Sequence, residues 1–379
     1  MSRTIGTLAL SPTANVRWAP PTPSKGNEMT PIRTLLALSA LAICHVATAA
    51  DTKPLEITAV TQVGPLFPQY TKVDIPILRD ELQAKSGGKI KVKLASYPEM
   101  NVGGPEVLRL LRSGQIDIGA VTLATASGDV PLLDGFDLPG LNNSIPQARK
   151  VADALAPFAD EKLRRLGVKL IATYTYTPQM LFCNRPVTGL GSLKGLKVRV
   201  AGPALGALVE SFGGQPVSLA FGEVYTALER KTVDCAITGV GSGNSAKWTE
   251  VSSSLYTRII SGATAGYLVN LSWWTKLDPS LRTMINDSLM KVQEAQWKLA
   301  DEATQDGVDC NVGNAAKCKI HALATHPMTA VKSNPADDAT VKAALTDRIL
   351  PDWVKRCGPD CGDIFNRVVT PVTGVAYKK

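Results

Sequence analysis

The segment PEVLRLLRSGQIDIGAV, residues 105–121, aligns without gaps on GEVYTALERKTVDCAIT, residues 222–238. Each segment predicts a short helix followed by a strand, and upstream KVKLA (91–95) matches KVRVA (197–201), which predicts a strand before each helix. Repeated strand–helix–strand units are typical of parallel sheets. The sequence therefore predicts two similar α/β lobes, with chance similarity over a short window as the alternative. The identical pairs are Glu106 and Glu223, Val107 and Val224, Leu111 and Leu228, and Asp117 and Asp234.

Three further segments carry helical patterns. Residues 71–88 have apolar side chains at helical spacing and end in two glycines, as a helix terminus should. Residues 145–167 predict another helix, or two helices broken at Pro157. The longest helix is predicted for residues 278–307, between a capping Asp278 and a terminal glycine. At 1.5 Å per residue it would be about 40 Å long, which is enough to brace both lobes.

The first fifty residues predict export. A segment that begins at Met29 has one basic residue, a mostly apolar run and a small-residue cleavage site. We expect a signal peptide over residues 29–50, a mature chain that begins close to Asp51, and localisation in the periplasm. Residues 1–28 are polar and proline-rich, which predicts a disordered stretch from a misassigned start site. No run of eighteen apolar residues follows residue 50, so no membrane span is expected in the mature chain.

Net charge and cysteine content limit the kinds of partner and of cross-link that the chain can have. The chain has a formal net charge of +8 without a basic run, which disfavours nucleic acid as a partner. The excess either attracts small anions or is a solvated basic surface. Six cysteines follow residue 50, an even number that suits disulfides in an oxidising compartment. The candidates are the four C-terminal cysteines, Cys310, Cys318, Cys357 and Cys361.

We expect at least one disulfide among these four cysteines, most simply Cys310–Cys318, tying down a C-terminal segment that is otherwise poor in core residues. Their spacings fit no zinc pattern and no histidine is interleaved, so no metal site is predicted.

Catalytic motifs are sparse. His321 and His326 are the only histidines after residue 50, and no G-x-S-x-G elbow occurs. GVGSGN (239–244) lacks the third glycine of a dinucleotide loop, so no cofactor is expected. Asp134 and Asp137 lie in LLDGFDLPGL, where turn chemistry accounts for them. A binding protein rather than an enzyme is predicted, with a secreted hydrolase as the alternative from another class.

Several motifs carry a family resemblance. LKGLKVRV, FGGQPVSLAFGEVYTALE and VDCAITG followed by AKWTEV resemble the solute-binding proteins of tripartite ATP-independent periplasmic (TRAP) transporters, C4-dicarboxylate-receptor type. The segments GGKIKVKL, EVLRLLRSGQIDIGAV, FDLPGL and LSWWTKLDPSLR fall in the order that the family shows. The resemblance covers about residues 55–305 and leaves out the cysteine-containing C-terminal segment.

The resemblance implies a two-lobed, class II-like α/β fold. Each lobe would be a mixed sheet flanked by helices, and the lobes would be joined by crossover strands and one long bridging helix. Lobe I would comprise residues 51–175 and 264–303, and lobe II residues 176–263 and 304–379 with the C-terminal segment. Such a protein captures a small organic acid between its lobes and delivers it, as a monomer, to the permease subunits of a TRAP transporter. A binding protein of an ATP-driven importer is the nearest alternative.

The resemblance also assigns site residues. Arg199, in the GLKxRV motif, corresponds to the family's carboxylate receptor, and its planar guanidinium suits two parallel hydrogen bonds to a carboxylate. From strand alternation alone, Lys197 and Arg199 would lie on a solvated basic face. Phe221 corresponds to an aromatic residue that packs on the ligand.

Four positions differ from the sialic-acid-binding members of the family. Thr238, Thr122, Thr125 and Gln179 stand where those members carry an asparagine, a glutamate and two arginines, which predicts a smaller or less polar acid. Trp248 is a candidate for an aromatic pocket, with packing in the core as the alternative.

Overall fold

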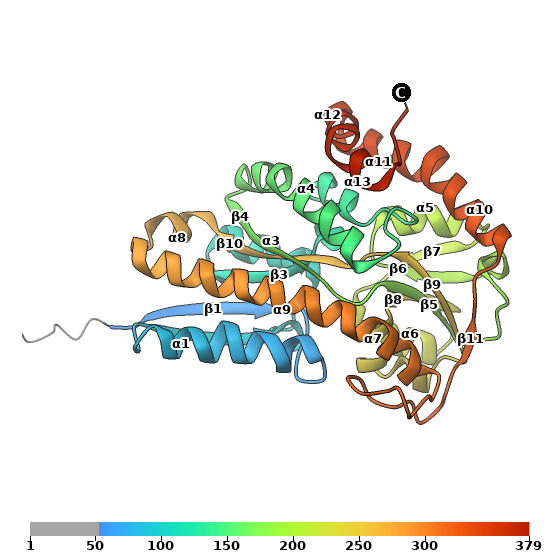
Figure 1. Ribbon diagram of the computed structural model, residues 1–379, viewed down its shortest axis with the longest axis horizontal. Helices are drawn as coiled ribbons and strands as arrows, with labels where there is room; N and C mark the ends of the chain where they lie inside the picture. Colours follow the sequence, from blue (N-terminus) through green and yellow to red (C-terminus); the bar gives the residue numbers. More distant parts are fainter. Residues whose placement is uncertain (1–52, 379) are drawn as a thin grey trace, which may run out of the picture. The chain divides into compact units, whose positions relative to one another are not determined.

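The two repeated segments form matching helix–strand units on two separate sheets (Figure 1). The computed structural model describes residues 53–378; the expected signal peptide and the stretch before it lie outside them. One unit is α3 (Gly104–Ser113) followed by β3 (Ile118–Thr122), and the other is α6 (Val224–Glu229) followed by β8 (Cys235–Gly239). The valine and leucine pairs that the segments share are buried in both.

The shared glutamates make the same hydrogen bond at the start of each helix. The Glu106 Oε2 atom accepts the Gly103 N–H at 2.7 Å, and the Glu223 Oε2 atom accepts the Ala220 N–H at 2.9 Å. Amide groups before the first turn have no partner inside a helix, so a carboxylate three residues along satisfies one of them.

The shared aspartates are also equivalent. The Asp117 Oδ2 atom accepts the Thr58 N–H at 2.8 Å, and the Asp234 Oδ2 atom accepts the Lys197 N–H at 2.9 Å. Each aspartate therefore ties the end of its helix–strand connection to the neighbouring parallel strand. Equivalent bonds at equivalent positions identify a structural repeat rather than chance similarity.

Both sheets are mixed, as predicted. Sheet I has the strand order β2–β1–β3–β10–β4 and sheet II the order β11–β9–β5–β8–β6–β7. In sheet I, β1 is parallel to β2 and β3, whereas β10 is antiparallel to β3 and β4. In sheet II, β6 is parallel to β7 and β8, whereas β5 is antiparallel to β8 and β9. The remaining bounds are β1 Leu55–Thr61, β2 Ile90–Ser96, β4 Val168–Thr175, β5 Gln179–Cys183, β6 Lys197–Val200, β7 Gln215–Ser218, β9 Ser254–Ser261, β10 Thr264–Asn270 and β11 Thr329–Val331.

One strand match in the sequence analysis was wrong. Residues 91–95 form β2 at the edge of sheet I, whereas residues 197–201 contain β6, which lies inside sheet II between β7 and β8. The counterpart of β6 is therefore β1, and the counterpart of β2 is β7. A strand, a second helix and a loop separate β6 from α6, and a five-residue pattern of alternating basic and apolar residues did not distinguish these strands.

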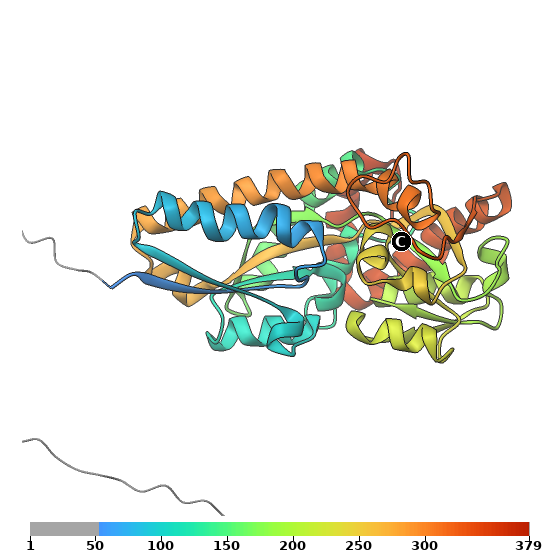
Figure 2. The ribbon, with the colours of Figure 1, turned by 90° about the horizontal axis from the view of Figure 1, so that it is seen from below.

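Two strand connections cross between the sheets, and α9 makes the third crossing on the way from β10 to β11. Residues 176–178 connect β4 of sheet I to β5 of sheet II, and residues 262–263 connect β9 of sheet II to β10 of sheet I. The helix α9 (Pro279–Asn311) packs against β4 on sheet I and against α7 (Val240–Ser245) on sheet II (Figures 1 and 2). Crossover strands and a long bridging helix are thus present as predicted.

Helix ends differ in detail from the sequence pattern. Asp278 caps α9 as expected, since its Oδ1 atom accepts the Ser280 N–H at 2.8 Å. Gly307 does not end the helix, which continues to Asn311. A Cβ atom at Gly307 would lie 3.1 Å from the Gly241 amide nitrogen, so this glycine allows close packing of α9 on α7.

The other predicted helices are present. The helix predicted for residues 71–88 is a π-helical segment, η1 (Tyr70–Glu81), that continues into α1 (Leu82–Lys85) and ends before the two glycines. The helix α4 (Ile145–Arg164) is a single helix with Pro157 inside it. On sheet I, η1 and α9 lie side by side over one face, and α3 covers the other (Figure 2). No helix among residues 53–378 has the length and apolar character of a membrane span.

The C-terminal segment contributes more to the core than the sequence suggested. Trp353 and Phe365 are both fully buried, with ring centroids 5.8 Å apart. One apolar cluster runs from α3 and α4 through this segment to α5 (Pro203–Ser211) and sheet II. The segment therefore packs on elements of both sheets. Its elements are α10 (Pro335–Ala344), η7 (Leu345–Ile349), α11 (Leu350–Cys357), α12 (Pro359–Ile364), η8 (Phe365–Val369) and α13 (Thr370–Thr373).

Candidate functional site

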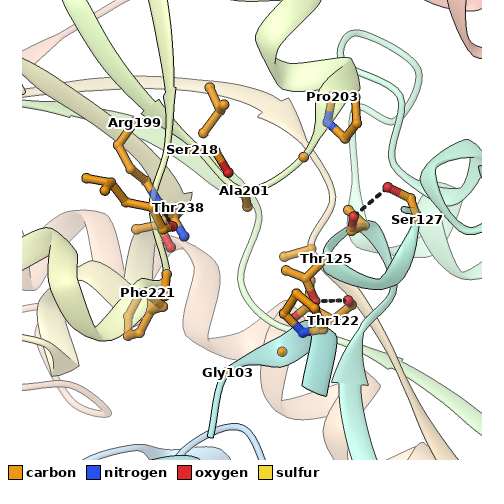
Figure 3. A pocket seen from close by; sticks show the side chains of 18 of the residues that line it. Gly103, Thr122, Thr125, Ser127, Arg199, Ala201, Pro203, Ser218, Phe221 and Thr238 are labelled. Carbon is orange, nitrogen blue, oxygen red and sulfur yellow. Dashed lines mark hydrogen bonds between the residues drawn. The ribbon is translucent and has the colours of Figure 1, made fainter. Parts of the chain in front are cut away.

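A cleft of about 1350 Å³ lies between the two sheets. Its walls come from the carboxyl ends of parallel strands on both sides: Gln62 follows β1, Thr122 ends β3, Ala201 follows β6 and Thr238 lies near the end of β8 (Figure 3). Ligands of open α/β sheets bind at these ends, where loops and helix N-termini present polar groups. The repeat thus places two equivalent polar edges opposite each other.

Arg199 is the buried cation of the cleft. Its side chain is in β6, the residue is 3% exposed, and it lines the cavity. The Nε atom donates to the Leu219 carbonyl at 3.1 Å and the Nη1 atom to the Ile237 carbonyl at 3.1 Å. Among residues 53–378, no carboxylate forms an ion pair with it and Nη2 has no hydrogen-bond partner, whereas backbone carbonyls fix its orientation.

Burial lowers the pKa of Arg199 to about 10. This value still leaves the guanidinium charged at neutral pH. A buried charge without a counter-ion is costly, because low-dielectric surroundings replace water around it. Arg199 is therefore prepared to receive an anion from the cleft.

Phe221 forms the aromatic part of the wall. It opens η5 (Phe221–Glu223), lines the cleft and stacks on Trp248 with ring centroids 5.4 Å apart. Phe67, from the sheet I side, meets it edge-on at 6.1 Å. Trp248 itself is fully buried, packs on Phe182 and does not line the cleft. The candidate role of Trp248 in solute contact is thus replaced by packing in the core, behind Phe221.

The sheet I side of the cleft is neutral and polar. The Oγ1 atom of Thr122 donates to Gln62 Oε1 at 2.5 Å, and the Thr122 N–H donates to the same oxygen at 3.1 Å. The Thr125 hydroxyl donates to the Thr122 carbonyl at 2.7 Å. The structure thus brings both threonines to the cleft and adds Gln62, which the sequence analysis missed.

Gln179 and Thr238 complete the predicted set. Gln179 Nε2 donates to Ser261 Oγ at 3.0 Å and to the Gly262 carbonyl at 2.9 Å, so this amide holds the second crossover. Thr238 lies on β8, next to β6 in sheet II, and lines the cleft. All the predicted solute-binding residues except Trp248 therefore line one cavity.

The sequence did not reveal an ion pair beside the cleft, in which Arg356, a lining residue, contacts Asp134, which does not line it. The carboxylate of Asp134 is 2% exposed and accepts hydrogen bonds from Arg356 Nη2 at 2.8 Å and from the Ala204 N–H at 3.2 Å. Burial raises the pKa of Asp134, against the hydrogen bond from Arg356. Asp137 accepts the Thr264 N–H and hydroxyl at 2.5 and 2.7 Å. These aspartates hold tertiary contacts rather than only a turn.

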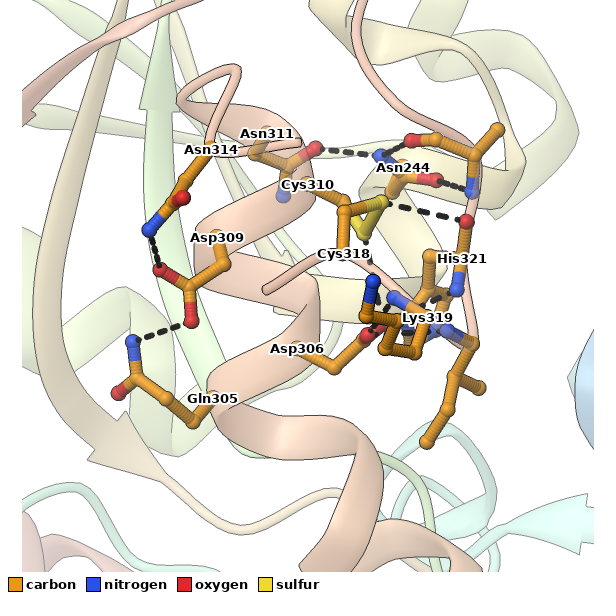
Figure 4. The surroundings of a disulfide bond; sticks show 12 residues. Asn244, Gln305, Asp306, Asp309, Cys310, Asn311, Asn314, Cys318, Lys319 and His321 are labelled. Carbon is orange, nitrogen blue, oxygen red and sulfur yellow. Dashed lines mark hydrogen bonds and ion pairs between the residues drawn. A yellow bond between two sulfur atoms is a disulfide. The ribbon is translucent and has the colours of Figure 1, made fainter. Parts of the chain in front are cut away.

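The histidines and the C-terminal cysteines lie away from the cleft wall. His321 is buried against Asp306, with 2.9 Å between Nδ1 and Oδ2, and it follows the loop that the Cys310–Cys318 disulfide closes (Figure 4). Burial lowers the pKa of His321, against its contact with Asp306. His326 is exposed. Neither histidine lines the cleft, and no cluster of three metal-ligating side chains occurs within residues 53–378.

Three disulfides are present in the described chain. They join Cys310 to Cys318, as the sequence analysis expected, Cys357 to Cys361, and Cys183 to Cys235. The last bridge links directly paired residues of β5 and β8 in sheet II. Its two cysteines are 52 residues apart, so spacing gave no signal for their pairing.

Two α/β lobes with a polar cleft at the ends of their strands define a two-lobed solute-binding protein. A family model described as bacterial extracellular solute-binding protein, family 7 (DctP), matches residues 60–332. The chain belongs to this family, which comprises TRAP solute-binding proteins and not enzymes. The resemblance found in the sequence motifs is thereby confirmed.

Individual relatives agree with this assignment. The chain is 27% identical over 234 residues to the 2,3-diketo-L-gulonate-binding periplasmic protein YiaO of Escherichia coli, covering 61% of this chain and 71% of that protein. The fold matches DctP7, a Bordetella pertussis extracytoplasmic solute receptor binding pyroglutamic acid, with a TM-score of 0.74, 20% identity, and coverage of 85% and 100%. It also matches a TRAP solute-binding protein of Desulfovibrio salexigens, solved with orotic acid, with a TM-score of 0.74, 18% identity, and coverage of 84% and 98%.

Proposed function

We propose that the protein is the periplasmic receptor of a TRAP transporter, which captures a small organic acid in the cleft and delivers it to the membrane permease subunits. Membership of the DctP family supports this proposal, and the relatives named above bind 2,3-diketo-L-gulonate, pyroglutamic acid and orotic acid. On this proposal the protein is a non-catalytic monomer. Its moving parts are lobe I, residues 51–175 and 264–303, and lobe II, residues 176–263 and 304–379, with hinges at the two crossovers.

The observation that carries the proposal is the buried guanidinium of Arg199, which has no carboxylate partner among residues 53–378. A carboxylate placed against its free N–H groups accepts parallel, charge-assisted hydrogen bonds and neutralises the buried cation. Phe221 packs on the body of the acid, supported from behind by Trp248. Thr122, Thr125, Gln179 and Thr238 line the rest of the site.

The proposal is tested by calorimetry on Arg199 variants. A thermal-shift screen of organic acids first identifies a solute, since a ligand at 100 times its Kd adds about 2.7 kcal/mol of stability. Loss of one partner of a desolvated ion pair costs about 3–5 kcal/mol, so Arg199→Ala should weaken binding by roughly two to four orders of magnitude. Arg199→Lys should recover only part of the affinity, because an ammonium lacks the planar fork.

Lys197→Ala is the matched control, since Lys197 is an exposed cation on the same strand. It should change the Kd by less than about threefold, in line with the small worth of exposed charges. An Arg199→Ala variant that binds as tightly as this control would place the anion site elsewhere.

A further inference from the structure

The cleft offers one buried cation to a solute. Its lining includes three basic side chains, those of Arg199, Lys355 and Arg356. Arg356 already donates to the buried Asp134 carboxylate, and Lys355 is exposed on α11. Among the described residues, only Arg199 combines burial with the lack of a carboxylate partner. A solute with two carboxylates would therefore have to bury the second one without a buried cation beside it.

Gln62 presents a neutral donor on the opposite lobe. Both hydrogen bonds from Thr122, one from its amide and one from its hydroxyl, end on the same side-chain atom of Gln62. Two donors require that this atom is the carbonyl oxygen, so the orientation of the amide is fixed. The Gln62 NH₂ group then has no acceptor among residues 53–378, although the side chain is half-buried in the cleft wall. It is free to donate to a solute.

The space beside these polar groups suits a compact or flat apolar body. Phe67 and Phe221 enter the cleft from the two lobes, and the stacking of Phe221 on Trp248 fixes its ring. Aromatic faces favour apolar and planar groups and add nothing to the binding of a second charge.

We infer that the cleft selects a monocarboxylate whose other end carries a neutral hydrogen-bond acceptor, such as an amide or ketone carbonyl, and that Gln62 recognises this end. This inference rests on the proposed function, in which Arg199 binds the carboxylate. A neutral carbonyl needs only the Gln62 N–H groups as partners, whereas a carboxylate in the same place loses its hydration without gaining a counter-charge.

The test compares acids that differ only at the far end. Calorimetry is carried out with succinamate and succinate, glutaramate and glutarate, and 4-carbamoylbenzoate and terephthalate, each pair being a monoamide and its diacid. In each pair that binds, the monoamide should bind about 10- to 100-fold more tightly, which is the usual effect of leaving a buried polar group unpaired. A diacid that binds as tightly as its monoamide, or more tightly, overturns the inference.

Gln62→Lys is the matching variant, because it places a cation at the far end. It should shift the ratio of the two Kd values toward the diacid by at least tenfold. Gln115→Lys adds the same charge at an exposed position before β3, away from the cleft, and should leave the ratio unchanged. Equal shifts in both variants would mean that net charge, not Gln62, sets the preference.

The outcomes separate this inference from the proposed function. If no organic acid binds the wild-type protein in the screen, the proposed function fails and the inference fails with it. If diacids bind through Arg199 more tightly than monoamides, the proposed function stands and the inference is wrong.

Discussion

Arg199 and Asp74 are both buried ionisable side chains. At neutral pH Arg199 is charged, whereas Asp74 is close to its pKa. Arg199 retains its proton because burial lowers its pKa only to about 10. Asp74, 2% exposed within η1, has only neutral partners: the hydroxyl of Tyr267 and the amide of Gln296 donate to it. Burial raises the pKa of Asp74 to about 7, against these two hydrogen bonds. The cation faces the cleft, and the acid lies inside lobe I.

Asp74→Asn should change how stability depends on pH. The folded-state pKa of Asp74 is about 7 and its ordinary value is 3.8, so the unfolded chain loses this proton first as the pH rises. Between about pH 4 and pH 7 the folded state binds more protons, and stability falls with rising pH by up to about 1.4 kcal/mol per pH unit. Asparagine removes this slope.

Urea unfolding at pH 5 and pH 8 measures the effect. The free energy of unfolding of Asp74→Asn, relative to wild type, should increase by about 2 kcal/mol or more between the two pH values. Asp137, whose pKa burial raises to about 6, titrates in both proteins and cancels in the comparison. A difference that stays constant with pH would show that Asp74 is not protonated in the folded protein below neutral pH.

Among the elements, the disulfides differ in the length of chain that they close. Cys183–Cys235 joins neighbouring strands across 52 residues, whereas Cys310–Cys318 closes eight residues at the end of α9. A longer closed loop restricts the unfolded chain more.

Removal of the two bridges should therefore have unequal effects. Chain-entropy arithmetic gives about 4 kcal/mol for the Cys183→Ala, Cys235→Ala variant and about 2.5 kcal/mol for Cys310→Ala, Cys318→Ala. Alanine is preferred to serine, since Cys183 and Cys235 are fully buried. Urea unfolding without reductant checks the order; a larger loss in the second variant would contradict it.

Elements were predictable where several residues shared one pattern. The four identical pairs of the repeat indicated both helix–strand units, and Asp278 located the start of α9. The end of α9 was predicted wrongly at Gly307, because the sequence does not distinguish a glycine that permits close helix packing from one that ends a helix. The order of the strands within each sheet could not be predicted from short sequence patterns, since it depends on pairing between residues that are distant in the sequence.

The candidate site shows the same division. Arg199 could be predicted because it lies in a recognisable sequence motif. Gln62 and Arg356 could not be predicted, because their partners Thr122 and Asp134 are distant in the sequence and meet them only in the folded chain. For Trp248 the alternative of core packing is the correct one, because burial, not residue type, decides whether an aromatic ring faces a cavity or supports one that does.

On the scale of the whole molecule, the contacts of Asp134 join three parts of the chain. Asp134 is on the sheet I side, Ala204 is in the first turn of α5 on the sheet II side, and Arg356 comes from the C-terminal α11. The carboxylate is buried at the point where these parts meet.

Arg356→Ala should destabilise the protein by about 1–3 kcal/mol, because it removes the only cation that pairs with the buried Asp134 carboxylate among residues 53–378. Arg348→Ala is the control, since its ion pair with Glu210 is exposed on both sides and should be worth less than about 1 kcal/mol. Urea unfolding of both variants compares them. Equal losses would show that the Asp134 contact adds nothing beyond a surface ion pair.

The two crossovers also set the order in which the chain can be assembled. In sheet I, β10 is the only strand beside β4, and in sheet II, β9 separates β5 from β11. Both β9 and β10 lie after residue 253, so a nascent chain of 250 residues can complete neither lobe. A chain of that length therefore lacks a complete sheet in either lobe, and sheet II needs β11 as well, which follows α9. On the proposed periplasmic function, incomplete sheets in both lobes keep the growing chain from reaching its final fold before export.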